Sequence, residues 1–231
     1  MPIKPILFNT EMVQAILDGR KTCTRRLVKF LPGENSQWTG YIKDGLMLYN
    51  GRNEPCIRKV PYQPGDIMYV RETWQYLYEL DGNEQIIEGT GKYYYAATDT
   101  IPFDTYVDAS GVTHERVPWH PSIHMPKEAA RIWLKVTDVR VERLQEMKPV
   151  DVIKEGAYPD CWDCLNTYGE SGSQCCYGTE EQCSQCDEVM MEWEKLWNST
   201  IKKSDIDRYG WDANPWVWVI EFEWCKKPEG V

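Results

Sequence analysis

The chain has 231 residues, of which 42% are hydrophobic, enough to build a substantial core. No hydrophobic run approaches the roughly 20 residues that a membrane helix needs, so we expect no membrane span. Nine cysteines follow an N-terminus without a secretory leader, which indicates a cytoplasmic protein with reduced thiols or metal ligands rather than a disulfide framework.

The net charge of −10 is concentrated in one part of the chain. Residues 151–195 contain 11 acidic and 2 basic side chains and so contribute −9 of the total. Residues 1–30 contain 6 basic and 2 acidic side chains, a local surplus of +4. This distribution is compatible with a modest basic cleft, but it disfavours a long basic groove for duplex DNA.

The predicted elements are mostly strands. Residues 5–8 form a predicted strand, and Thr10 is the expected N-cap of a helix over residues 11–17, which Gly19 ends. Further strands are predicted over residues 67–71, 93–97, 131–141 and 216–224. The strand at 131–141 alternates and is expected to be half-buried. In the strand at 216–224, Glu221 and Glu223 are expected on one face, and on the other Trp216, Trp218, Ile220, Phe222 and Trp224. Short helices are predicted over residues 150–156 and 188–197, the second from the spacing of Val189, Trp193 and Trp197.

Many strands with few, short helices indicate an α+β fold. The pattern has no βαβ alternation and no glycine-rich phosphate loop, which argues against a nucleotide-binding α/β sheet. A partly closed β-barrel fits better, and we expect residues 1–231 to form one domain.

Four segments, in order along the chain, resemble phage and prophage members of the ASCH family. Residues 19–26 read Gly-Arg-Lys-Thr-Cys-Thr-Arg-Arg and match the family pattern G-x-K-x-x-x-x-R. The other three segments are residues 64–74, 121–126 and 214–222. The resemblance covers residues 1–155 and 188–224. It implies a PUA-like barrel, related to RNA-binding and RNA-modification domains, with a cleft lined by the signature Lys and Arg.

The resemblance also implies candidate site residues. Lys21 and Arg26 would line a cleft for RNA or a modified nucleoside, with Arg25 beside them and an aromatic such as Trp74 nearby. Small bacterial members remove the acetyl group from 4-acetylcytidine with a Lys, a Thr and a Glu, which by motif position fall on Lys21, Thr24 and Glu155 here. In chemical terms, Lys21 with a lowered pKa would activate the Thr24 hydroxyl, and Glu155 would protonate the leaving amine.

Simpler readings of the same residues stay open. Lys21 and Arg26 would then only bind a phosphate or a base edge, Thr24 would be an ordinary strand residue, and Glu155 a solvated helix residue. Three functions therefore compete: a module that binds RNA or a modified nucleoside, an amidohydrolase acting on N-acylated cytidine, and a phage accessory protein that binds a host protein through its acidic segment.

Residues 157–187 form a cysteine-rich acidic insertion with a metal-binding pattern. Two C-x2-C pairs are separated by 18 residues, the spacing of a tetrahedral zinc knuckle. The four predicted zinc ligands are Cys161, Cys164, Cys183 and Cys186, with Cys175 or Cys176 as a substitute for one of them. Four thiolates leave no open coordination position, so the predicted zinc is structural.

Overall fold

The computed structural model describes residues 2–33, 38–43, 46–79, 81–83, 85–101, 106–107, 112–114, 117–157 and 184–230. Over these residues the fold is mixed α+β, with a sheet-rich core and few helices. The chain forms two compact units: the first comprises Met1–Leu17, Ile67–Leu134 and Trp224–Val231, and the second comprises Asp18–Asp66 and Lys135–Glu223. The described strands form no closed barrel, and the single-domain assignment stays a prediction.

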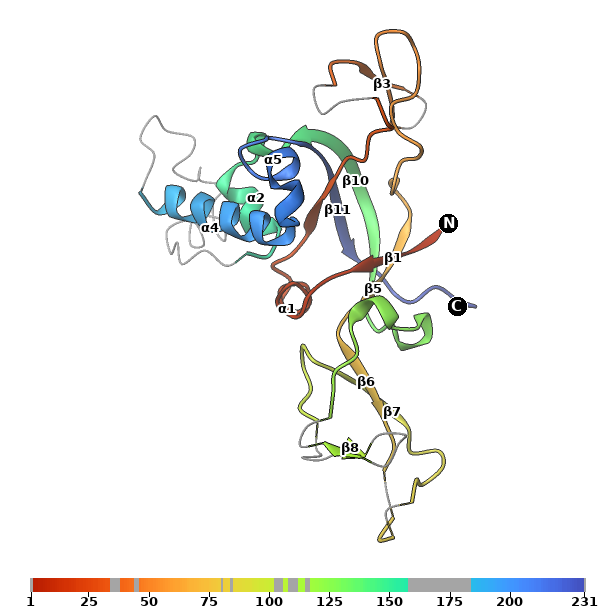
Figure 1. Ribbon diagram of the computed structural model, residues 1–231. Helices are drawn as coiled ribbons and strands as arrows, with labels where there is room; N and C mark the ends of the chain where they lie inside the picture. Colours follow the sequence, from red (N-terminus) through yellow and green to blue (C-terminus); the bar gives the residue numbers. More distant parts are fainter. Residues whose placement is uncertain are drawn as a thin grey trace, which may run out of the picture. The chain divides into compact units, whose positions relative to one another are not determined.

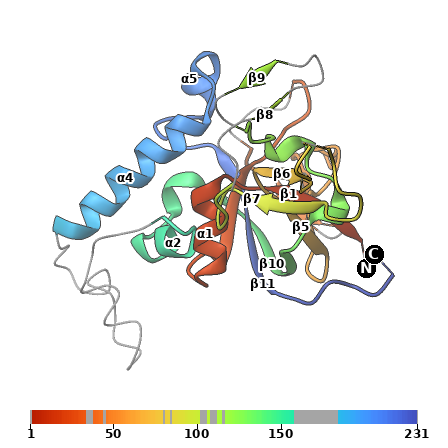
Figure 2. The same ribbon diagram turned by 90° about the horizontal axis from the view of Figure 1, so that it is seen from below.

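The first unit contains one parallel strand pair, two antiparallel pairs and one α-helix. Its elements are β1 (Ile3–Leu7), α1 (Thr10–Leu17), β5 (Ile67–Arg71), β6 (Trp74–Leu77), β7 (Lys92–Tyr95), β8 (Tyr106–Val107), β9 (Thr113–His114), η1 (Ser122–His124) and η2 (Lys127–Ala129). β1 runs parallel to β5 in a register from Ile3 opposite Ile67 to Leu7 opposite Arg71. β6 and β7 pair antiparallel, as Figure 2 shows.

Helix α1 begins one residue earlier than predicted. Thr10 is already its first residue, and the side chain of Asn9 accepts a hydrogen bond from the Met12 backbone N–H at 2.9 Å. The N-cap is therefore Asn9, and the prediction of Thr10 is wrong because both residue types suit this position. Gly19 does adopt the predicted positive φ, at 76°.

The second unit contains the C-terminal strand and most of the helices. Its elements are β2 (Cys23–Leu27), β3 (Tyr41–Lys43), β4 (Met47–Tyr49), most of β10 (Trp133–Arg143), η3 (Leu144–Glu146), α2 (Pro149–Lys154), α4 (Ser184–Thr200), η5 (Lys203–Asp205), α5 (Ile206–Tyr209) and β11 (Trp216–Trp224). In the strand order, β11 lies between β10 and β2. Figure 1 shows α2, α4 and α5 on the same side of β10 and β11.

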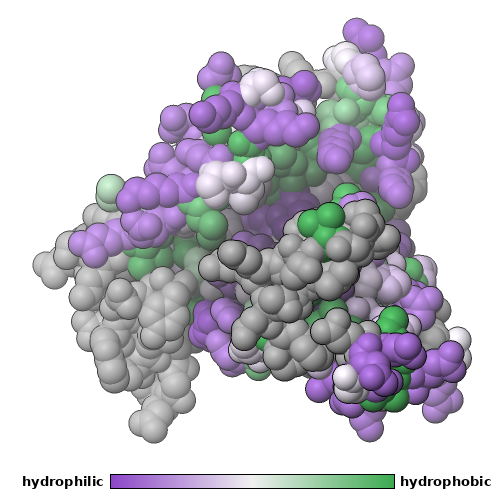
Figure 3. Space-filling view, turned by 60° about the horizontal axis from the view of Figure 1, so that its bottom comes forward, coloured by the Kyte–Doolittle hydropathy of each residue, from purple (hydrophilic) through white to green (hydrophobic). Residues whose placement is uncertain are grey.

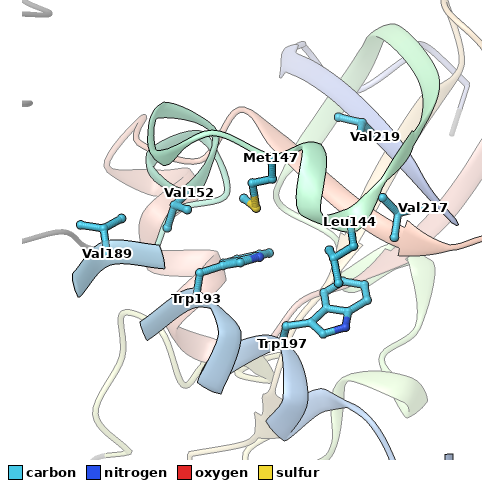
Figure 4. Close-up of a cluster of buried hydrophobic side chains, with 8 residues drawn as sticks. All are labelled: Leu144, Met147, Val152, Val189, Trp193, Trp197, Val217 and Val219. Carbon is cyan, nitrogen blue, oxygen red and sulfur yellow. The ribbon is translucent and has the colours of Figure 1, made fainter. Parts of the chain in front are cut away.

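A hydrophobic cluster joins α2 and α4 to the sheet of the second unit. Trp193 and Trp197 are each 6% exposed. They point from α4 toward α2 and the residues just before it, and toward β11 (Figure 4). Their four-residue spacing places both on one helix face, as the sequence predicts. The other buried members are Leu144, Met147, Val152, Val189, Val217 and Val219.

The two long strands are more deeply buried than their alternation predicts. Val217 and Val219 are 0% exposed, yet Trp218 on the opposite face is only 3% exposed. In β10, Trp133 and Leu134 are likewise buried on successive positions. The prediction that the 131–141 strand is half-buried is therefore wrong at Trp133, because neighbouring elements cover both faces there.

Among the described residues, no helix combines the length and the apolar character needed to cross a bilayer. On the face shown in Figure 3, hydrophobic residues reach the surface in small groups among hydrophilic ones.

Candidate functional site

The signature segment docks onto the C-terminal end of α2, within the second unit. The backbone N–H of Thr22 donates to the carbonyl of Lys154 at 2.8 Å, and Lys21 Nζ donates to the carbonyl of Glu155 at 2.6 Å. Arg20 Nη1 donates to the next carbonyl, that of Gly156, at 3.1 Å. Carbonyls at the end of a helix lack partners within it and favour nearby cations. The first role of Lys21 is therefore to donate to a carbonyl at the C-terminal end of α2.

Lys21, Arg25 and Glu155 form a buried ion cluster, and each residue is 3% exposed. The two carboxylate oxygens of Glu155 each meet one cation: Oε2 accepts from Lys21 Nζ at 3.0 Å, and Oε1 accepts from Arg25 Nη1 at 3.2 Å. Lys21 Nζ also donates to the Cys23 carbonyl at 2.8 Å. A buried charge is tolerated only when it is paired and hydrogen-bonded, so these three side chains depend on one another.

Arg25 extends this cluster toward partly exposed carboxylates. Its Nη2 lies 3.5 Å from Glu142 Oε2 and 3.5 Å from Asp151 Oδ2. Its Nε is buried and has no hydrogen-bond partner within the described part of the chain. Two buried cations thus share three carboxylates, and one donor is left over.

Burial changes the protonation behaviour of the cluster. It lowers the pKa of Lys21 below the ordinary lysine value, although the adjacent Glu155 carboxylate opposes the shift. Burial also raises the pKa of the Cys23 thiol, and Glu155 adds to that effect. Lys21 is therefore closer to releasing a proton at neutral pH than an exposed lysine, whereas the Cys23 thiol stays protonated.

A pocket of about 550 Å³ opens in the same unit and is strongly basic. Its lining includes four cationic side chains, those of Arg26, Lys29, Arg58 and Lys59, and no acidic one. Phe30 and Trp218 supply aromatic surface, and the remaining lining residues are Leu27, Leu31, Pro32, Ile57 and Pro61. This volume lies within the usual range for small-molecule sites.

Strand β2 separates the ion cluster from the pocket. In the register with β11, Arg26 lies opposite Trp218, while Arg25 lies opposite Val219, which packs in the hydrophobic cluster with the helices. Because successive strand residues point to opposite faces, Arg25 faces the helices and Arg26 faces the pocket. Thr24 shares the face of Arg26, and its Oγ1 accepts from Arg26 Nη1 at 2.8 Å.

The structure thus divides the predicted site residues into two groups. Lys21, Arg25 and Glu155 come together in the ion cluster, and Thr24 contacts Arg26. Of the signature residues Lys21, Thr24 and Arg26, only Arg26 lines the pocket, since Lys21 and Thr24 are 3% and 1% exposed.

Trp74 belongs to the first unit, where its ring lies 5.8 Å from that of Tyr93 and 5.1 Å from that of His120, measured between centroids. Its role in ligand binding stays a prediction.

Sequence reasoning did not assign Trp218, Phe30, Arg58 and Lys59 to the site. Trp218 could have been found from the sequence. If the closing strand pairs with the signature strand, one of the alternating residues of the closing strand must lie opposite Arg26. Arg58 and Lys59 lie in a segment without a regular pattern, so nothing local predicted that they face the pocket.

The predicted zinc ligands Cys161, Cys164 and Cys183 lie outside the described residues. Cys186 lies within α4, where only its backbone is described. Over the described ranges, no three acidic, thiol or imidazole groups are arranged to hold a metal ion.

Comparison with known proteins returns no match: no family model, no curated protein and no solved structure is significantly similar to this chain.

Proposed function

We propose that the basic pocket of the second unit binds the nucleobase portion of RNA or of a modified nucleoside. The observation that carries this proposal is the lining itself: Arg26 of the signature shares one pocket with Phe30 and Trp218. Guanidinium and aromatic groups bind planar bases by hydrogen bonding and stacking, the latter worth roughly 1–3 kcal/mol per base. The proposal agrees with the resemblance to ASCH proteins, and with it we propose a PUA-like, partly closed barrel for the chain.

In this proposal the ion cluster holds the pocket wall in place. Lys21 and Glu155 tie the start of β2 to α2, and Arg25 joins them from within the strand. The next residue, Arg26, is then held by Thr24 Oγ1 and by the Arg25 carbonyl, at 2.8 and 3.0 Å. The signature Lys is thus a positioning residue, and the signature Arg contacts the ligand.

The second candidate function is hydrolysis of an N-acylated cytidine. The lowered pKa of Lys21 favours it, because a lysine nearer to neutrality can serve as a base. Thr24 Oγ would attack the acyl carbonyl while Lys21 takes its proton. Lys21 would pass that proton through the Glu155 carboxylate to the exocyclic amine as the C–N bond breaks, and water would then hydrolyse the acyl-threonine. Since Thr24 is 1% exposed, turnover requires its hydroxyl to become accessible from the pocket.

Binding and turnover measurements on the same variants separate the two functions. Purified protein is titrated with the four common ribonucleosides and with 4-acetylcytidine, by calorimetry, and release of acetate from 4-acetylcytidine is followed. Binding requires that Phe30→Ala and Arg26→Gln weaken the affinity of at least one ligand, while Lys148→Gln, an exposed lysine before α2, leaves it unchanged.

Lys21→Met is the diagnostic variant. If the protein only binds its ligand, this variant loses stability but retains most affinity at a temperature where it is folded. If the protein is a hydrolase, the variant binds 4-acetylcytidine but releases no acetate. Failure of every ligand to bind wild-type protein would contradict the proposed function.

We also propose that Cys161, Cys164, Cys183 and Cys186 bind one structural zinc ion. The support is the spacing of the two C-x2-C pairs. Elemental analysis of protein purified under reducing conditions without chelator is expected to find about one zinc per chain. The Cys161→Ser, Cys164→Ser double variant should lose it, whereas Cys225→Ser should not. That the acidic insertion binds a host protein stays a prediction.

A further inference from the structure

We infer that the ligand of the basic pocket carries a phosphate group, so that the pocket takes a nucleotide rather than a free nucleoside. This inference rests on the proposed function and specifies the chemical class of its ligand. The phosphate belongs either to a free nucleotide or to an RNA strand, and both present the same charged oxygens.

The charge of the pocket is the first support. Arg26, Lys29, Arg58 and Lys59 line it without any acidic side chain, in a chain whose net charge is −10. Like charges gathered around one cavity repel one another, and a neutral nucleoside does nothing to relieve that repulsion. A terminal phosphate brings a charge of about −1.5 to −2 at neutral pH, together with strong hydrogen-bond acceptors.

The pairing of the two pocket walls is the second support. Phe30 and Ile57 form an antiparallel bridge, and the Leu31 N–H donates to the Cys56 carbonyl at 2.8 Å. In this antiparallel arrangement Lys29 is placed opposite Arg58. Like charges directly opposite on paired segments are destabilising, unless an anion lies between them. The local backbone therefore holds two cations together at the pocket.

Exposure then divides the roles of the four cations. Lys29, Arg58 and Lys59 are exposed, whereas Arg26 is only half-exposed and is held by Thr24 and the Arg25 carbonyl. We assign the phosphate to the three exposed cations. Arg26, Phe30 and Trp218 are left for the base and the sugar.

The experiment compares each ribonucleoside with its own 5′-monophosphate and with a hexanucleotide of the same base, by calorimetry at about 0.1 M salt. Three contacts with exposed cations are expected to make the monophosphate bind about tenfold more tightly than the nucleoside. A pocket variant with Lys29→Gln, Arg58→Gln and Lys59→Gln should remove this advantage. The affinities of this variant for the nucleoside and for its monophosphate should then agree within about twofold.

The matched control removes three exposed cations of the same unit that do not line the pocket, with Lys202→Gln, Lys203→Gln and Arg208→Gln. It should keep the tenfold advantage, and thermal unfolding checks that both triple variants are folded. Tighter binding of the hexanucleotide than of the monophosphate identifies RNA as the source of the phosphate, and the reverse order identifies a free nucleotide.

Equal affinities of nucleoside and monophosphate for wild-type protein would overturn this inference and leave the proposed function standing. So would an equal loss of the advantage in both triple variants. If neither nucleosides nor nucleotides bind, the proposed function itself is wrong.

Discussion

Among the described residues, each unit contains one buried glutamate, and the two are neutralised in different ways. Glu72 in the first unit is 1% exposed and forms a bidentate pair with Arg131, at 2.9 and 2.8 Å. The Arg131 side chain keeps 28% of its surface exposed and lies over the ring of Tyr95, 4.0 Å from its centroid. Glu155 in the second unit instead meets two cations, Lys21 and Arg25, whose side chains are each 1% exposed.

The Glu72–Arg131 pair is therefore a local ion pair, whereas the Glu155 cluster holds together the segments that form a site. The Glu72 pair has one charge of each sign, and its cation reaches water. The Glu155 cluster has two buried cations on one buried carboxylate, with Glu142 and Asp151 as further partners of Arg25. It leaves the Arg25 Nε without a partner among the described residues, and it joins the signature to the end of a helix 130 or more positions later. Buried groups such as Lys21, whose pKa is lowered by burial, are common at functional sites.

The largest expected effect is that of Glu155→Gln. It leaves Lys21 and Arg25 buried without their shared carboxylate, and so should lower the free energy of unfolding by about 3–5 kcal/mol. Urea denaturation followed by tryptophan fluorescence measures the change. Glu142→Gln is the control, since this partly exposed carboxylate should contribute less than about 1 kcal/mol. Equal losses in the two variants would show that Glu155 is no more important than a surface carboxylate.

In the first unit we expect the loss of Arg131 to cost more stability than the loss of the Glu72 charge. Arg131→Met strands the buried Glu72 carboxylate and should cost about 3 kcal/mol. Glu72→Gln should cost only about 1–2 kcal/mol, because Arg131 keeps its contacts with water, Thr98 and Tyr95. The same urea titrations test this order. If Glu72→Gln proves the more costly change, solvent access of Arg131 does not explain the difference between the two clusters.

The lowered pKa of Lys21 predicts a pH dependence for the stability of the second unit. Between its folded-state pKa and the ordinary value of about 10.4, the unfolded lysine holds a proton that the folded one has lost. The free energy of unfolding should therefore rise with pH in this window and fall as pH decreases through it. Urea midpoints between about pH 7 and pH 10 should rise less steeply in Lys21→Met than in wild type. Parallel profiles would contradict the lowered pKa.

The smallest expected effect concerns Tyr95, whose hydroxyl donates to the Ala129 carbonyl at 2.7 Å. Tyr95→Phe should cost about 1 kcal/mol at neutral pH. Burial raises the pKa of Tyr95 to about 12, so above about pH 10 the unfolded tyrosine ionises first and wild-type stability falls. The stability difference between wild type and variant should therefore narrow above that pH. A constant difference would show that Tyr95 does not ionise differently in the two states.

Much of the local structure was predictable. The strands at 67–71 and 216–224 are observed with the predicted bounds, and the 188–197 helix lies within the longer α4. The N-cap of α1 could not be predicted, because Asn9 and Thr10 have similar capping preferences and only the backbone selects between them. Half-burial of the 131–141 strand failed at Trp133 for another reason: alternation shows that one face is apolar, but not what covers the other.

The candidate site likewise has one part that the sequence predicted and another that it did not. The amino-acid sequence by itself determined a basic signature after a glycine turn, a later carboxylate at Glu155 and a tryptophan-rich closing strand. The tertiary structure decided that Glu155 neutralises Lys21 and Arg25 on one face of β2, while Arg26 turns to a pocket on the other. It also brought Arg58 and Lys59 to that pocket. The physical reason is that the role of a strand residue depends on the register and packing of its neighbours, and these depend on contacts between segments far apart in the chain.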